Sequence, residues 1–115
     1  MIDLPNGTVT FLFTDIEGST QLWEQNPEQM RSALARHDAI LRQSIASHGG
    51  HLIKSTGDGI HAAFARAIDA INATITGQRD LQALDGQSAP APSGELQIRV
   101  RMGVHTGEAE MRDGD

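Results

Sequence analysis

The chain has 115 residues, nine basic and 15 acidic side chains, a formal net charge of −6 and no cysteine. This length suits one domain, the acidic balance disfavours unassisted binding to nucleic acid or anionic membranes, and the lack of cysteine excludes a disulfide framework. No apolar run reaches the roughly 18 residues of a membrane span and the N-terminus lacks a secretory signal pattern, so we expect a cytoplasmic protein with neither nucleic-acid nor membrane partners.

The first predicted element is a strand over residues 8–14, in which apolar and polar side chains alternate. Alternation of this kind is typical of a strand with one buried face. The apolar members are Val9, Phe11 and Phe13. The opposite face of the sheet would carry Thr8, Thr10, Arg99 and Arg101, and we expect it to stay uncovered because it is too polar for a second core.

Two helices are predicted next. Ser19 or Thr20 is the expected N-cap of a short helix over about residues 20–25, and Pro27 is suited to the start of a longer one. Apolar residues then recur every three or four positions as far as residues 49–50, a pair of glycines typical of a helix end.

Residues 57–59 read Gly-Asp-Gly between two strand-like segments, 51–56 and 60–64, which predicts a β-hairpin. A third helix is predicted from residue 65 to about residue 84. Its expected apolar stripe consists of Phe64, Ile68, Ile71 and Ile75.

The last part of the chain predicts a loop over residues 86–94 and a strand over 96–104, followed by a turn at 106–107 and the start of another strand at 108. The order is therefore β–α–β–β–α–β. This order predicts an α+β fold of the ferredoxin-like kind, with an antiparallel or mixed sheet and helices on one face.

Two aspartates carry the most chemical information. Asp15 ends the first strand and Asp58 lies in the hairpin, and each alone is explained by turn or capping chemistry. We expect the first strand and the strand after the first helices to be the two central strands, which brings both carboxylates to one edge of the sheet. Two adjacent carboxylates repel each other unless a cation lies between them, and magnesium suits such oxygen ligands.

The turn over residues 16–20 adds a possible phosphate site. Free amides at a helix start favour anions, and Gly18 would allow a ligand to approach the backbone closely. The turn lacks the Gly-Lys-Ser/Thr of a Walker A loop. Lys54, the only lysine in the chain, lies just before the hairpin and alone is explained as a solvated strand residue.

Three segments together resemble the class III adenylyl/guanylyl cyclase catalytic domain, and most closely the bacterial members in which this domain begins a longer regulator. Residues 11–20 read FLFTDIEGST, residues 54–59 read KSTGDG and residues 101–107 read RMGVHTG. The resemblance covers nearly the whole chain. It implies that the 3′-hydroxyl of a nucleoside triphosphate attacks its own α-phosphate, giving a 3′,5′-cyclic nucleotide and pyrophosphate for intracellular signalling.

The resemblance also implies site residues. The metal ligands for two Mg²⁺ or Mn²⁺ ions would be Asp15, Asp58 and the carbonyl of Ile16; the phosphate-binding amides would be those of Glu17, Gly18, Ser19 and Thr20; the purine-binding residue would be Lys54. Lys54 favours ATP over GTP. In this family the site lies between two catalytic domains, which implies a homodimer in which Lys54 serves the metals held by its partner.

The sequence departs from the family at its end. The family domain is normally much longer, and its later part carries a purine-contacting Asp or Thr and an Asn and Arg that stabilise the transition state. Residues 1–115 are therefore interpreted as the N-terminal part of a cyclase domain, either a fragment or a natural truncation. No catalytic residue is assignable beyond the metal ligands, and we expect negligible turnover by these residues alone.

Other readings stay open. A non-catalytic module that binds nucleotide or metal, or that pairs with a full-length cyclase, would carry the same motifs. An RNA-recognition fold is disfavoured because Thr10, Leu12 and Val100 stand where stacking aromatics are needed. A diguanylate cyclase is disfavoured because its Gly-Gly-Asp/Glu-Glu-Phe hairpin is absent.

Overall fold

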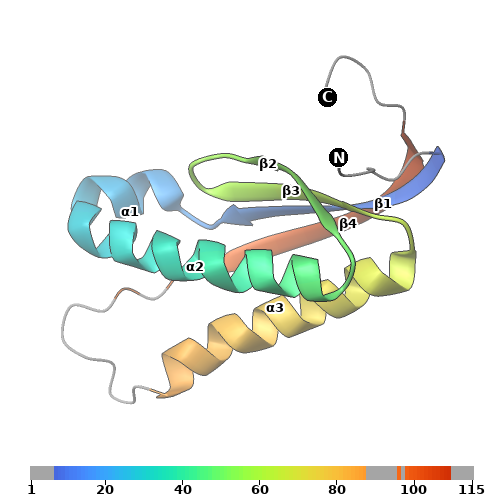
Figure 1. Ribbon diagram of the computed structural model, residues 1–115. Coiled ribbons are helices and arrows are strands. Elements are labelled where there is room, and N and C mark those ends of the chain that lie inside the picture. Colours follow the sequence, from blue (N-terminus) through green and yellow to red (C-terminus); the bar gives the residue numbers. More distant parts are fainter. Residues whose placement is uncertain (1–6, 88–95, 97, 110–115) are drawn as a thin grey trace.

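The computed structural model describes residues 7–87, 96 and 98–109. Its elements are β1 (Gly7–Ile16), α1 (Ser19–Gln25), α2 (Pro27–Ser47), β2 (His51–Ser55), β3 (Gly59–Phe64), α3 (Ala67–Gln87) and β4 (Val100–Ala109) (Figure 1). Helix α3 continues through the first two positions of the predicted 86–94 loop, and the rest of that loop lies outside the described residues. None of the described helices combines the length and the apolar character that crossing a bilayer requires.

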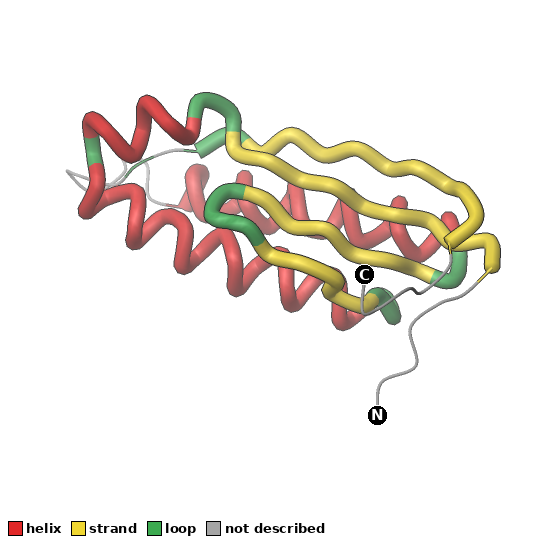
Figure 2. The backbone as a smooth tube through the Cα atoms, turned by 90° about the horizontal axis from the view of Figure 1, so that it is seen from above, coloured by secondary structure: helices red, strands yellow, loops and turns green. Residues whose placement is uncertain are grey.

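The four strands form one antiparallel sheet in the order β2-β3-β1-β4. Helices α2 and α3 lie on one face of this sheet and leave the other uncovered, whereas α1 lies beyond the ends of the strands and packs beside α2 (Figure 2). The predicted α+β, ferredoxin-like class is confirmed. The predicted central pair is wrong, because β2 lies at the edge and β3 pairs with β1. Strand β3 takes the interior place because five of its six residues are buried, whereas β2 has none that are fully buried.

The covered face of β1 is the opposite of the predicted one, although Val9 of the predicted apolar set is also buried, at 1% exposure. Thr10, Leu12 and Thr14 are buried, whereas Phe13 is 44% exposed. The buried threonines are tolerated because they form hydrogen bonds: Thr10 Oγ1 lies 2.8 Å from Thr106 Oγ1, and the Ile60 amide donates to Thr14 Oγ1 at 3.0 Å. Since side chains alternate along a strand, Asp15 lies on the same uncovered face of the sheet as Phe13.

The core lies between the sheet and the helices. Its buried cluster consists of Leu12, Leu41, Ile45, Ile60, Ala62, Phe64, Ala70 and Ala73. Gly50 is required behind helix α2, because a Cβ at this position would collide with the Phe64 ring. This close contact holds the start of β2 against the core.

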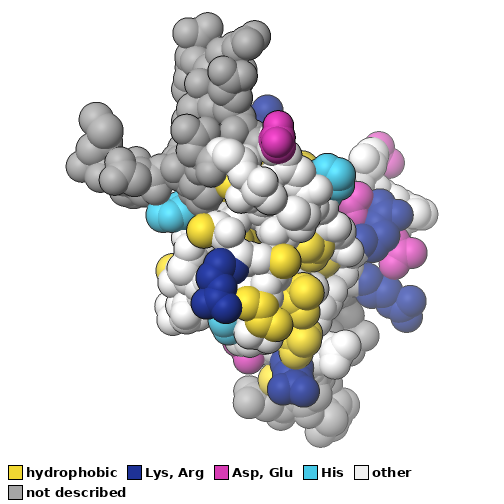
Figure 3. Space-filling model, turned by 90° about the vertical axis from the view of Figure 1, so that its right-hand side faces the viewer, with side chains coloured by type: hydrophobic (Ala, Val, Ile, Leu, Met, Phe, Trp, Pro, Cys, Tyr) yellow, Lys and Arg dark blue, Asp and Glu magenta, His cyan; other side chains and the backbone are white. Residues whose placement is uncertain are grey.

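Helix α3 packs through small residues instead of its isoleucines. Ala70 and Ala73 are buried, and Ser44 of α2 donates a hydrogen bond to the Ala73 carbonyl at 2.6 Å. The predicted apolar stripe is wrong beyond Phe64: its members Ile68, Ile71 and Ile75 are 44–48% exposed. Figure 3 shows hydrophobic side chains at the surface on the side where α3 begins. The close approach of α2 and α3 explains this rotation of α3, because only small side chains fit between the two helices.

Strand β4 corrects the predicted end of the chain. It begins at Val100, later than predicted, and it continues through residues 106–107, where a turn was expected. Each of its residues has a partner in β1, from Ile16↔Val100 to Gly7↔Ala109. Pairing with the long β1 strand outweighs the local turn preference of Thr-Gly.

Candidate functional site

The two predicted metal-binding aspartates lie on neighbouring segments at one end of the sheet. Asp15 of β1 is the register partner of Gly59, the first residue of β3. The amide of Ile16 donates to the carbonyl oxygen of Asp58 at 3.1 Å. A Cβ at Gly59 would collide with the Thr14 carbonyl oxygen, so this close approach of the two chains needs glycine. The two aspartates are brought together by the pairing of β3 with β1, and not by β2, which was expected to be the second central strand.

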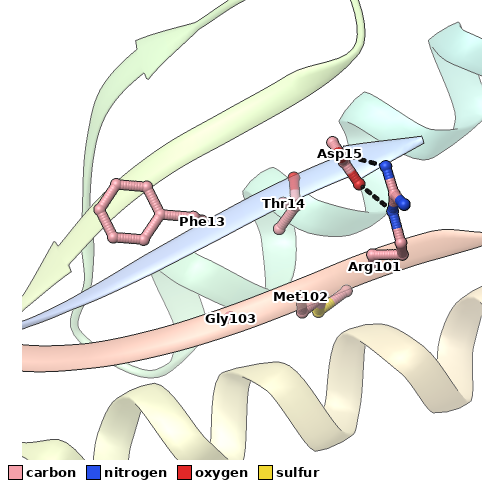
Figure 4. Close-up of a pocket in the computed structure, with 6 residues that line it drawn as sticks. All are labelled: Phe13, Thr14, Asp15, Arg101, Met102 and Gly103. Carbon is pink, nitrogen blue, oxygen red and sulfur yellow. Dashed lines mark hydrogen bonds and ion pairs between the residues drawn. The ribbon is translucent and has the colours of Figure 1, made fainter. Parts of the chain in front are cut away.

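Asp15 forms an ion pair with Arg101 of β4 (Figure 4). Nε of Arg101 donates to Oδ1 at 2.8 Å and Nη2 donates to Oδ2 at 2.7 Å, an arrangement that engages both carboxylate oxygens. The hydrogen bonds from Arg101 hold the pKa of Asp15 below its ordinary value of 3.8. Neither the polar strand face nor the 101–107 motif indicated this ion pair, because the pairing of Arg101 with Asp15 depends on the β1–β4 register.

Asp58 has a different partner. Its side chain is half-buried, and the hydroxyl of Ser19 donates to Oδ2 at 2.7 Å. Ser19 begins helix α1, whose N-cap is Gly18 in the left-handed conformation with φ 66°. The prediction that Ser19 or Thr20 caps this helix is therefore wrong, because α1 starts one residue earlier than that prediction required and Ser19 lies within its first turn.

The predicted phosphate-binding turn follows β1 directly. The amide of Glu17 donates to the carbonyl of Arg99 at 2.8 Å, so it already has a partner. The first amides of an α-helix lack acceptors within the helix. The amides of Gly18, Ser19 and Thr20 stand at this position at the start of α1.

Lys54 lies away from Asp15, on edge strand β2, where its side chain is exposed. Its register partner is His61, whose ring stacks on Phe13 with centroids 4.3 Å apart and also contacts Phe11 at 5.4 Å. Burial, together with the charge of Lys54, lowers the pKa of His61 below 6.5. The alternation of residues 8–14 did not indicate this aromatic cluster, because it predicted that Phe11 and Phe13 belong to the core.

A shallow depression of about 330 Å³ surrounds Asp15. It is lined by Phe13, Thr14, Asp15, Arg101, Met102 and Gly103 (Figure 4). Phe13 points away from the Asp15–Arg101 pair in this view, so the depression has an aromatic end and a charged end.

The donor set suits a hard divalent cation. The carboxylates of Asp15 and Asp58 and the carbonyl of Ile16 offer only oxygen atoms, which Mg²⁺ and Mn²⁺ accept. No group of three or more His, Cys, Asp or Glu side chains that could hold a metal occurs within residues 7–87 and 98–109 as described. A cation bound by two carboxylates would complete its coordination with water and substrate phosphates, as Mg²⁺ commonly does.

Comparison with known proteins identifies the family. Residues 3–112 match the adenylate and guanylate cyclase catalytic domain, and the chain belongs to this family. An uncharacterized protein of Mycobacterium tuberculosis is 41% identical over 111 residues, covering 95% of this chain and 34% of the relative. An adenylate cyclase of Podospora anserina is 33% identical over 120 residues, covering 93% of this chain and 6% of the relative.

Solved structures show the same fold. A Trypanosoma brucei adenylate cyclase in its monomeric state superposes with a TM-score of 0.75 at 26% identity, covering 96% of this chain and 61% of that one. A guanylyl cyclase superposes with a TM-score of 0.73 at 26% identity, covering 90% of this chain and 57% of that one. The chain therefore spans about three fifths of these cyclase structures and a third of the mycobacterial relative.

Proposed function

We propose that residues 1–115 form the N-terminal part of a nucleotide cyclase domain that converts ATP, in preference to GTP, to the 3′,5′-cyclic nucleotide and pyrophosphate. The observation that carries this proposal is the juxtaposition of Asp15 and Asp58 beside the Gly18 turn at one end of the sheet. Relatives named as adenylate cyclase and structures of both cyclase types support it. The reaction is assigned to the intact protein, since the chain spans only part of these relatives.

Asp15, Asp58 and the Ile16 carbonyl would hold two Mg²⁺ or Mn²⁺ ions. When bound, such ions lower the pKa of the attacking hydroxyl and stabilise the pyrophosphate. The role of this chain is to hold oxygen donors at the end of β1 and in the turn between β2 and β3. Arg101 neutralises Asp15 in the structure described here, and its fork of N–H donors also matches phosphate oxygens.

The turn at residues 17–20 would bind the β- and γ-phosphates through its backbone amides. The positive end of α1 and the close approach permitted by Gly18 favour this role. The Glu17 amide must first release the Arg99 carbonyl before it can donate a hydrogen bond to a phosphate oxygen. The metals are needed here as well, because the net charge of −6 opposes a free triphosphate.

Lys54 would bind the purine. Its strand lies at the edge of the sheet, whereas Arg101 and Asp15 lie on the β1–β4 side. A second copy placed against the uncovered face would bring Lys54 of one chain to the metal ligands of the other. Phe13 and Val104, both more than 40% exposed, supply apolar surface to such a homodimer.

Binding and turnover test the proposal separately. The 115-residue chain is expected to bind Mn²⁺–ATP by calorimetry, and Asp15→Asn or Asp58→Asn should each abolish this binding. Asp80→Asn, on the exposed face of α3, is the matched control. Cyclic AMP formation is expected from a complete cyclase domain that contains residues 1–115 and is expected to be negligible from these residues alone. Unchanged binding in either aspartate variant would refute the proposed metal site.

A non-catalytic role is the second candidate, since the chain spans about 60% of the solved cyclases. A nucleotide-binding or pairing module would bind Mn²⁺–ATP with the same dependence on Asp15 and Asp58. It would form no cyclic nucleotide, either alone or joined to the remainder of a cyclase domain. The turnover assay therefore separates the two candidates.

A further inference from the structure

The hydroxyl of Ser19 joins two segments that are distant in sequence. It donates to Oδ2 of Asp58 at 2.7 Å, linking the first turn of α1 to the β2–β3 hairpin. Both side chains are half-buried, which shields the bond from competing water. It is therefore a defined contact of the site rather than a chance contact between exposed side chains.

The Ser19 hydroxyl is available for this contact because it does not cap the helix. Gly18 is the N-cap of α1, and no side chain caps this helix end. Serine at a helix start usually bonds a backbone amide of its own helix. Here its only recorded side-chain bond among the described residues goes to a carboxylate across the chain.

The backbone around Asp58 is held on both sides. Its carbonyl accepts a hydrogen bond from Ile16, and the following residue, Gly59, packs against the Thr14 carbonyl too tightly for any side chain. The Thr56 amide also donates to the Gly59 carbonyl at 2.9 Å. With the backbone held, the remaining freedom of Asp58 is rotation of its carboxylate, and this is the motion that the Ser19 bond restricts.

We propose that Ser19 is a positioning residue that orients the Asp58 carboxylate for the divalent cation. This inference rests on the proposed function. An ionised carboxylate has about four acceptor positions. The Ser19 bond uses one on Oδ2 and leaves Oδ1 and a second position on Oδ2 for a metal ion. Partners of this kind, which hold a metal ligand without touching the metal, contribute about 10- to 100-fold to metal affinity.

The same residue also connects the metal with the phosphate turn. The amide of Ser19 belongs to the predicted phosphate-binding turn, whereas its hydroxyl holds Asp58. Movement of α1 would therefore shift a metal ligand and the phosphate amides together. Asp15 has no equivalent link, because its partner Arg101 comes from β4.

Mn²⁺ titration of the 115-residue chain, followed by the EPR signal of free Mn²⁺, tests this role. Ser19→Ala is expected to weaken Mn²⁺ binding by about 10-fold or more. Ser19→Thr, which keeps a hydroxyl, should restore affinity to within about threefold of the original chain. The matched control is Ser47→Ala, which removes a hydroxyl that donates only within the end of α2 and should leave Mn²⁺ affinity unchanged.

The outcomes distinguish this inference from the proposed function. If Asp58→Asn abolishes Mn²⁺ binding but Ser19→Ala does not weaken it, the positioning role is wrong and the metal site stands. If Asp58→Asn has no effect, both are wrong. Thermal unfolding of every variant is measured alongside, and a loss of affinity in Ser19→Ala supports the role only where the unfolding midpoint matches that of Ser19→Thr.

Discussion

The two faces of the sheet differ in what their side chains do. On the helix-covered face, Leu12 and Ile16 fill the core and every buried threonine that lies among them has a hydrogen-bond partner. On the open face, Phe13 and Asp15 meet solvent, stacking on His61 and pairing with Arg101 respectively. Alternate residues of this one strand thus serve the stability of the fold or the chemistry of the site. Substitutions on the covered face should therefore lower the free energy of unfolding much more than substitutions of their neighbours on the open face.

The largest expected difference is between Leu12→Ala and Phe13→Ala. Leu12 is 1% exposed in the core, so its truncation should cost about 2–5 kcal/mol of unfolding free energy. Phe13 is 44% exposed and loses mainly its ring contacts, so about 1 kcal/mol is expected. Urea unfolding of the two variants measures both values. Equal costs would contradict the division between the two faces.

Thr14→Val sharpens the comparison within the covered face. Valine keeps the shape of threonine but leaves the buried Ile60 amide without its acceptor, which should cost about 1–3 kcal/mol. Thr8→Val, at an exposed position of the same strand, is the control and should change stability by less than about 0.5 kcal/mol. A stable Thr14→Val variant would show that the hydroxyl is dispensable.

The pH dependence of stability should report His61 on the open face. Because its pKa is lowered in the folded chain, the unfolded chain binds the proton more readily. The contribution of His61 to the free energy of unfolding is therefore fully present above pH 6.5. It decreases as the pH falls below that value and levels off below the folded-state pKa. His61→Phe keeps the aromatic stack and should remove this part of the dependence. Denaturant midpoints measured between pH 5 and pH 7.5 test it.

The smallest expected effect on stability is that of Arg101→Gln. Both members of the Asp15–Arg101 pair are largely exposed, at 46% and 65%, so unfolding midpoints at pH 7 should hardly move. The pKa of Asp15 should instead rise towards its ordinary value of 3.8, because the two hydrogen bonds that favour the charged form are lost. An NMR titration of the Asp15 carboxyl carbon measures this shift. An unchanged pKa would mean that the ion pair does not persist in solution.

Local patterns predicted much of the fold. The Gly-Asp-Gly hairpin, the helix that begins at Pro27 and ends before Gly49, and the α+β order all follow from short-range preferences that the packing does not oppose. Gly49 adopts φ 74°, as expected of a residue just past a helix end. The motifs at residues 11–20, 54–59 and 101–107 together indicated the cyclase family.

The incorrect predictions concern which face of β1 and which stripe of α3 is buried, where the local sequence pattern allows either. Both alternating sets of β1 are apolar enough to be buried, and the isoleucines of α3 make a better stripe than Ala70 and Ala73 when the helix is considered alone. Burial was decided by the close packing of α2 on α3 and by partners for the buried threonines. The pairing of β1 with β4 likewise overrode the local turn signal at residues 106–107.

The amino-acid sequence by itself determined the elements, their order and the two aspartates with the turn that follows the first. Only the tertiary structure decided which face of β1 is covered, that Arg101 engages Asp15 and that Ser19 engages Asp58. The physical reason is the range of the interactions. Turn, cap and alternation preferences act within a few residues, whereas face, register and cross-chain partners depend on segments that meet only when the whole sheet and its helices have packed.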